Sequence, residues 1–407
     1  MIISGIRRWQ QLVKCNNKEE SKHMEIYFDN AATTAVLPEV KDIMLETLDK
    51  DYGNPSSKHL KGVAAERYVS SARKNIAKIF KCESKEIYFT SGGTESNNIA
   101  IRGICEANKR EGNHIITSRI EHASVYNPIL YMEQNGYRVS FLDVDSKGIV
   151  NIRQLEELLG DDTVLVSVMA VNNEIGTVEP IKEISDVIQT FNKKNNKKVH
   201  FHVDAVQAFG KQIIYPGRMG IDAMSVSGHK IHGPKGSGAL YVRNNVKIKP
   251  LVYGGGQEKD MRSGTENTTA IAGMGKAVEL AYERLDQNCL IMDKVKKCLI
   301  QGAVSIDGVT DNSGDAPHIA SLSFSGVKSE VLLHALEDKG IYVSSGSACS
   351  SNHPAVSGVL KAIGQADELL DSTLRFSFCE LNSVREAEYT VDVLKEIVPM
   401  LRKYTRK

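Results

Sequence analysis

The middle of the chain alternates short apolar, β-branched runs with longer amphipathic segments. Segments 97–110 and 180–193 carry apolar residues at helical spacing. Strands that alternate with such helices predict βαβ units and a mostly parallel sheet. The expected strands are residues 86–90, 114–118, 138–144, 163–171, 199–204, 223–227 and 238–242. Two runs, VLVSVMAV (164–171) and FHVDAV (201–206), are apolar on both faces, as in a sheet that helices cover on both sides.

The pattern changes after about residue 275 and predicts a second, smaller α+β domain. Its expected elements are a long helical stretch over 270–302, a strand at 321–327, a helical segment at 331–341 and a terminal helix around 384–402. We therefore expect residues 44–280 to form a large domain, and residues 26–43 and 281–407 to form a small one. Residues 1–25 are polar and basic, which predicts a disordered extension or an upstream start codon. A mitochondrial presequence is the less favoured alternative, because three of its residues, Lys18, Glu19 and Glu20, fit it poorly.

Composition narrows the class of protein only a little. Hydrophobic residues make up 41% and charged residues 25% of the 407 positions, and 51 basic against 50 acidic side chains give a formal charge of +1. This balance gives no reason to expect a surface for nucleic acid or anionic membranes. No run approaches the roughly 18 apolar residues of a membrane span. The opening residues also lack the apolar core of a secretory signal.

Seven cysteines are scattered along the chain, and no two are spaced as CxxC. An odd number without such spacing argues against a disulfide framework and against a zinc site. A reducing compartment is the simplest setting for these cysteines. We therefore expect a cytoplasmic protein without a metal centre.

Residues 90–101 (TSGGTESNNIAI) follow an expected strand and open a helix. Gly92 and Gly93 let the backbone approach a ligand, and the first N–H groups of the helix favour an anion. The Thr94 hydroxyl adds a donor, so the segment predicts a phosphate-binding site. A glycine turn with Thr94 as helix cap explains the same residues.

Asp204 lies at the end of a buried strand, where open α/β sheets place their ligands. A buried carboxylate needs a cationic partner, and a protonated pyridine nitrogen would serve. The alternative is an Asp that caps the following helix.

Lys230 follows the next strand at once, inside the glycine-rich segment SGHKIHGPKG. A lysine there offers Schiff-base chemistry, as in enzymes that use pyridoxal 5′-phosphate (PLP). Ser227 and His229 would donate to a phosphate. A solvated lysine in a flexible loop is the alternative, and the order of the three motifs along the chain weighs against it.

Three further side chains complete the candidate chemistry. Cys349 lies in the Ser/Gly run SSGSACSS, which has no apolar periodicity to bury it, so we expect a reactive thiol rather than an incidental one. His122 follows a strand and would stack on a planar ring, or else be a satisfied core histidine. Arg375 would pair with an α-carboxylate or form a structural salt bridge.

Together these motifs resemble one family. From residue 26 to about residue 395 the chain closely resembles the cysteine desulfurases of the NifS/IscS type, in the class V aminotransferase group of PLP enzymes. The matching motifs, in the family's order, are DNAATT, GNPSSKH, TSGGTESNN, EHASV, VNNEIGT, HVDAVQ, SGHKIHGPKG, RSGTEN, SSGSACSS and LRFSF. The resemblance implies fold type I, which has a mostly parallel large domain with helices on both faces and a smaller α+β domain.

The resemblance also implies a role for each matching residue. Lys230 would hold the cofactor covalently, His122 would stack on its ring and help to move protons, and Cys349 would be the nucleophile. Asn173 and Arg375 would bind the substrate. The other implied cofactor contacts are Gly93, Thr94, Asn173, Asp204, Gln207, Ser227, His229 and the partner subunit's Thr265.

The implied reaction is conversion of L-cysteine to L-alanine in a homodimer, with the sulfur carried by Cys349 as a persulfide. The sulfur would pass to an acceptor protein, either an iron–sulfur scaffold or a tRNA sulfurtransferase, without direct contact with nucleic acid or membrane. Two departures from the family leave the acceptor open: SSNHPAVSGVL follows Cys349, and CELNS stands after FSF where Gly-Arg is common.

Two alternatives stay open at this point. One is a selenocysteine lyase or another class V PLP aminotransferase; a transaminase would need no thiol at position 349. The other is a non-catalytic binding protein on the same fold, which the intact set of Lys230, Asp204, His122 and Cys349 weighs against.

Overall fold

The computed structural model describes residues 25–345 and 357–405. Cys349, the predicted nucleophile, and residues 1–24 of the predicted extension lie outside the described residues.

A seven-stranded sheet forms the centre of the molecule, with strand order β2-β8-β7-β6-β5-β3-β4. The strands are β2 (Ile87–Thr90), β3 (His114–Ser118), β4 (Arg138–Leu142), β5 (Thr163–Met169), β6 (His200–Asp204), β7 (Ala223–Ser227) and β8 (Gly238–Val242). β8 runs antiparallel to both of its neighbours, and the other pairs are parallel. The prediction of a mostly parallel sheet is confirmed.

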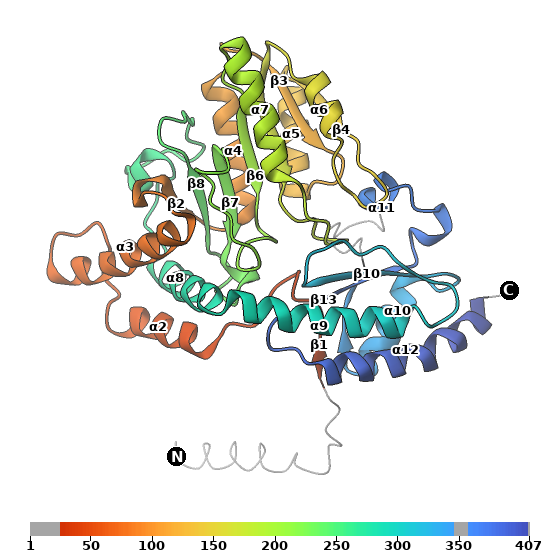
Figure 1. Cartoon of the computed structure of the whole chain (residues 1–407). Helices are drawn as coiled ribbons and strands as arrows, with labels where there is room; N and C mark the ends of the chain where they lie inside the picture. Colours follow the sequence, from red (N-terminus) through yellow and green to blue (C-terminus); the bar gives the residue numbers. More distant parts are fainter. Residues whose placement is uncertain (1–24, 346–356, 406–407) are drawn as a thin grey trace, which may run out of the picture.

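Helices cover both faces of this sheet (Figure 1). The helices of this unit are α2 (Pro38–Asp49), which packs on α8, and α3 (Leu60–Phe80), α4 (Gly93–Ala107), α5 (Ala123–Gln134), α6 (Ile152–Leu158), α7 (Ile181–Asn195) and α8 (Thr268–Glu283), with short turns η1 (Ser84–Glu86), η2 (Gly228–Lys230) and η3 (Gln257–Asp260). α4 and α5 share one apolar core with the sheet, and α3, α6, α7 and α8 share another. Every residue of β5, β6 and β7 is buried, which explains why these strands read as apolar on both faces.

A second sheet lies below the first in Figure 1, in the order β12-β13-β10-β9, and it is antiparallel throughout. The strands are β9 (Val309–Asp311), β10 (Ile319–Phe324), β12 (Ser344–Ser345) and β13 (Thr373–Ser377), while β1 (Ile26–Tyr27) pairs with β11 (Ile341–Tyr342). The accompanying helices are α9 (Leu285–Ala303), α10 (Ser329–Glu337), α11 (Gly358–Ala362), η4 (Asp367–Leu369) and α12 (Val384–Thr405). They enclose a separate apolar core, so the second structural unit expected after residue 275 is present.

The helical stretch expected over 270–302 is two helices, α8 and α9, which meet at Arg284. The φ of Arg284 is −124°, outside the helical range, so the chain turns at this residue. α8 packs against α2 and α3, whereas α9 packs against α12 in the other core. β1 belongs to the second unit, but Val40 of α2 lies in the core of the first. The predicted domain boundaries, between residues 43 and 44 and between residues 280 and 281, therefore remain a prediction.

Candidate active site

The carboxyl ends of β5, β6 and β7 meet the first turns of α4 and α5 around one cavity. The strands are parallel neighbours, so their ends lie along a single edge of the sheet. The cavity is lined by Gly93, Thr94, His122, Ser124, Met169, Val171, Asn173, Asp204, Val206, Gln207, Ser227 and His229. Most of the residues that sequence reasoning assigned to a cofactor therefore line the same space.

The start of α4 provides the anion-binding end of this cavity. Gly92, not Thr94, is the N-cap of α4, so the interpretation of Thr94 as a cap is wrong. A Cβ on Gly93 would approach Val206 Cγ2 to 2.6 Å, so a larger residue there would force the Val206 side chain to move. Ser227 Oγ lines the cavity, is buried, and has no hydrogen-bond partner among the described residues. An unpaired buried hydroxyl beside the free N–H groups of a helix start is a suitable contact for a phosphate.

Asp204 is held in place by two donors. Asn97 Nδ2 donates to Oδ2 of Asp204 across 2.7 Å, and the backbone N–H of Val206 donates to Oδ1 across 3.0 Å. No helix follows that Asp204 could cap, so that alternative does not describe its role. The carboxylate is 5% exposed and lines the cavity, where it can pair with a cation.

Sequence reasoning missed Asn97 and Ser124, which connect Asp204 to His122. Asn97 Nδ2 also donates to Ser124 Oγ across 2.8 Å, and that hydroxyl lies 2.8 Å from His122 Nδ1. Both missed residues lie inside motifs already singled out, TSGGTESNN and EHASV. Their side chains turn toward one another only because α4 and α5 are neighbours in the fold.

His122 is the N-cap of α5, and its Nδ1 accepts a hydrogen bond from the backbone N–H of Ser124 across 3.1 Å. In the neutral ring the proton is therefore on Nε2. Burial lowers the pKa of His122; Asp204 opposes this effect, and Lys230 and Arg375 add to it. The ring is thus neutral near pH 7 and able to take up a proton.

Lys230 and Gln207 converge on the segment that carries the DNAATT motif. Lys230 Nζ donates to the carbonyl oxygens of Ala31 at 2.6 Å and Ala32 at 2.8 Å. Gln207 Nε2 donates to the same Ala31 oxygen across 3.0 Å. Next to Lys230, burial and the neighbouring lysines lower the pKa of His229 to about 4, so this ring is neutral.

Arg375 is buried, and Asn173 lies beside it. Arg375 Nη1 donates to the carbonyl oxygen of Asn173 across 2.9 Å, and Nη2 donates to Asp29 Oδ1 across 2.8 Å. The structural salt bridge considered above is therefore present. Its Nε is buried and has no partner among the described residues, which leaves one donor for a further acceptor.

Thr265 lies apart from this group. It is exposed and is not among the residues that line the cavity. Nearby Arg262 pairs with Glu95 of α4 across 3.0 Å, which ties the segment to the start of that helix.

The donor set fits PLP. The phosphate would contact the start of α4 and Ser227 Oγ, the pyridine nitrogen would pair with Asp204, and the aldehyde carbon would bond to Lys230. The assignment rests on the unpaired Ser227 hydroxyl beside the start of α4 and on the buried Asp204 carboxylate, which line the same cavity.

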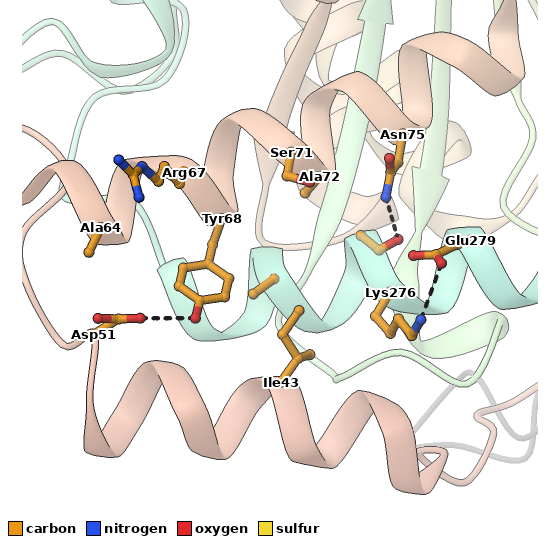
Figure 2. A pocket seen from close by; sticks show the side chains of 12 residues that line it. Ile43, Asp51, Ala64, Arg67, Tyr68, Ser71, Ala72, Asn75, Lys276 and Glu279 are labelled. Atoms are coloured by element: carbon orange, nitrogen blue, oxygen red, sulfur yellow. Dashed lines mark hydrogen bonds and ion pairs between the residues drawn. The ribbon is translucent and has the colours of Figure 1, made fainter.

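Another pocket, of about 390 Å³, lies between α2, α3 and α8 and is shown in Figure 2. None of the predicted site residues lines it. Tyr68 donates to Asp51 across 3.0 Å, and Lys276 pairs with Glu279 across 3.2 Å, so these polar groups are already matched. We assign no chemistry to this pocket.

No helix in the described part of the chain is both long and apolar enough to cross a membrane.

Comparison with known proteins agrees with this site. The model of the family described as aminotransferase class-V matches residues 26–389. The cysteine desulfurase IscS of Clostridium botulinum strain Hall is 41% identical over 384 residues, which are 93% of this chain and 95% of that protein. A solved NifS-like protein superposes with a TM-score of 0.87 at 36% identity, covering 93% of this chain and 100% of its own. A structure described as SspA in complex with cysteine superposes with a TM-score of 0.76 at 34% identity, covering 87% and 99%. The chain belongs to the aminotransferase class-V family and, within it, to the cysteine desulfurases of the NifS/IscS type.

Proposed function

We propose that this chain is a PLP-dependent cysteine desulfurase that converts L-cysteine to L-alanine and takes up the sulfur on Cys349. One observation carries the proposal: the Asp204 carboxylate and the unpaired Ser227 hydroxyl line a single cavity at the carboxyl ends of β6 and β7, directly before Lys230 in the chain. The solved neighbour that was determined with cysteine supports cysteine as the substrate.

When bound, PLP supplies an electron-withdrawing ring that stabilises negative charge at the α-carbon of the substrate. The chain's own residues orient the reactants. Asp204, held by Asn97, presents a fixed negative charge to the ring nitrogen. Neutral His122 accepts a proton, and Arg375 and Asn173 hold the substrate beside it.

Sulfur transfer needs a second thiol. The Cys349 thiolate attacks the substrate sulfur, an S–S bond forms, and the C–S bond breaks with its electron pair left on carbon, which takes a proton. Cys349–SH and cysteine thus give Cys349–S–SH and alanine, a balance that requires no external oxidant.

We propose further that the active enzyme is a homodimer in which the partner subunit's Thr265 completes the phosphate site. Exposure of Thr265 outside its own chain's cavity supports this arrangement. A second copy would also cover exposed apolar side chains on each subunit. These are Val252 and Tyr253, which precede Thr265 in the chain, and Leu45, Leu48, Tyr52 and Leu60, which lie in or between α2 and α3.

We also propose that the protein that accepts the sulfur is an iron–sulfur scaffold or a tRNA sulfurtransferase. We further propose that the protein works in the cytosol. The cysteines among the described residues form no disulfide, which agrees with a reducing compartment.

The test uses two variants with matched controls. Lys230→Ala should abolish sulfide release and the covalent cofactor adduct that borohydride traps, whereas Lys235→Ala, an exposed lysine of the same loop, should retain both. Cys349→Ala should bind PLP normally and form no persulfide by mass spectrometry, whereas Cys298→Ala should behave as wild type. Full-rate desulfuration by Cys349→Ala would refute the role of this thiol, and a normal adduct in Lys230→Ala would refute the proposed cofactor lysine.

A further inference from the structure

Three metal-binding side chains meet behind the lysine loop, outside the cavity described above. His232 follows Lys230 by two positions, and Cys379 and Glu380 follow the end of β13 at Ser377 by two and three positions. His232 is 3% exposed and Cys379 is 7% exposed. One possible ligand atom from each of the three residues lies within 4.8 Å of the others.

The orientation of the His232 ring leaves one nitrogen available. Nδ1 lies 2.7 Å from the carbonyl oxygen of Ala35, and since a carbonyl only accepts, Nδ1 carries a proton. Nε2 faces Glu380 Oε2, which is 3.3 Å away, and a proton on Nε2 would make this contact an ion pair. This Nε2 is buried and has no hydrogen-bond partner among the described residues. Metal-bound histidines are commonly oriented in this way, with the other nitrogen donating to a carbonyl.

A lone pair and a carboxylate that face each other in a buried place repel unless a cation lies between them. The cation is either a proton on Nε2 or a metal ion. The thiol of Cys379 makes the metal ion the better match, because imidazole, thiolate and carboxylate together suit a borderline-soft divalent cation such as Zn²⁺.

Space for a fourth ligand is present. A cavity of about 10 Å³ is lined by His232, Cys379 and Glu380, and also by Lys211, Lys230, Asn288 and eight other residues. This volume accommodates about one water molecule. Three protein ligands and one water complete a tetrahedral zinc site.

A divalent ion can enter without a change in the net charge of the three ligands. Zn²⁺ would displace a proton from His232 and another from the Cys379 thiol, so entry of the ion leaves the net charge of the cluster unchanged.

We propose that His232, Cys379 and Glu380 bind one Zn²⁺ ion, which joins the end of β13 to the loop that carries Lys230. Cys379 and Glu380 stand where the family commonly has Gly-Arg, so the site is a feature of this chain rather than of the family's shared chemistry. Lys211 Nζ donates to the carbonyl oxygen of Lys230 across 2.6 Å, which connects the cluster to the cofactor lysine through one side chain.

The experiment uses tag-free, PLP-loaded, full-length protein. A Cys349→Ser background removes a thiol that would compete for zinc. The protein is stripped with a chelator and titrated with Zn²⁺ against a chromophoric chelator, and separately with Co²⁺, whose thiolate charge-transfer absorption reports a bound sulfur. Cys379→Ser and Glu380→Gln are the test variants in this background, and Cys298→Ser, a partly buried cysteine of α9, is the matched control.

We expect one tightly bound Zn²⁺ per chain in the background and in the Cys298→Ser control. Cys379→Ser should weaken binding by about 100-fold or more, since loss of even an outer-shell partner costs 10- to 100-fold, and the Co²⁺ charge-transfer band should disappear. Glu380→Gln should also weaken binding. Equal Zn²⁺ affinity in the background and in Cys379→Ser, or no bound zinc in either, would overturn the proposal and leave a proton as the cation.

Cys379 is buried, so its substitution is checked for folding through near-ultraviolet circular dichroism and PLP absorbance. If the variant does not fold, X-ray absorption at the zinc edge of the background protein decides the question. One sulfur with nitrogen and oxygen ligands supports the site, and coordination without sulfur overturns it.

Discussion

Asn97 and Asp204 are 107 positions apart in the chain, yet the Asn97 amide donates to the Asp204 carboxylate across 2.7 Å. The same amide nitrogen donates to Ser124, whose hydroxyl adjoins His122. One asparagine therefore sets the position of the two groups that we propose to flank the cofactor ring.

Replacing Asn97 with alanine should weaken PLP binding by about tenfold to a hundredfold, because a hydrogen bond to a charged group contributes about 1.5–3 kcal/mol. Asn98→Ala is the control, since the Asn98 amide bonds only to the carbonyl of Thr94 in its own helix. Cofactor dissociation constants from fluorescence titration provide the measurement. Equal affinity in the two variants would show that Asn97 does not orient Asp204.

Arg375→Lys should raise the KM for cysteine by about tenfold or more, because lysine cannot present the same planar set of donors. The change also removes the pairing with Asp29 or the bond to the Asn173 carbonyl, so the free energy of unfolding should fall as well. Steady-state kinetics and urea denaturation separate the two effects. A loss of stability with an unchanged KM would mean that Arg375 is only a structural salt bridge.

Mixed dimers of two variant chains test whether Thr265 of one subunit completes the cofactor site of the other. Thr265→Ala should weaken PLP binding by about tenfold, the effect of about 1.4 kcal/mol. In mixed dimers with Lys230→Ala, one of the two sites contains an intact lysine and an intact threonine, and it should bind PLP as tightly as wild type. Affinity that stays weak in the mixture would place Thr265 in its own subunit's site or outside any site.

Glu179 should make stability depend on pH. Burial raises its pKa to about 8, Asp145 adds to this, and a hydrogen bond from the Val150 N–H opposes it. Between pH 4.5 and about 8 the unfolded chain loses this proton while the folded chain keeps it, so the contribution of Glu179 to stability falls as pH rises.

Glu179→Gln removes that titration and should stabilise the protein relative to wild type more at pH 8 than at pH 5, by on the order of 1 kcal/mol. Urea midpoints at the two pH values give the comparison. Glu183→Gln, at an exposed position of α7, should show the same difference from wild type at both. A pH-independent effect of Glu179→Gln would contradict a raised pKa.

The strands and most helices follow from the sequence because their signals are local. Runs such as 114–118, 223–227 and 238–242 begin and end as predicted, since each is a short run rich in apolar residues and is bounded by polar or glycine residues. The break at Arg284 was missed because no proline or glycine marks it; it occurs where the chain passes from one core to the other.

The sequence by itself determined the mostly parallel sheet, the second α+β unit and the motifs that bring Asp204 and Ser227 to one cavity, because each depends on neighbours within a few residues. Only the tertiary structure decided the contacts between segments far apart in the chain. Asn97 reaches Asp204 because α4 packs on β6. His232 meets Cys379 and Glu380 because the lysine loop lies against the end of β13. The spacing of the cysteines argued against a metal site. Spacing along the chain cannot reveal ligands that come together only when the chain folds.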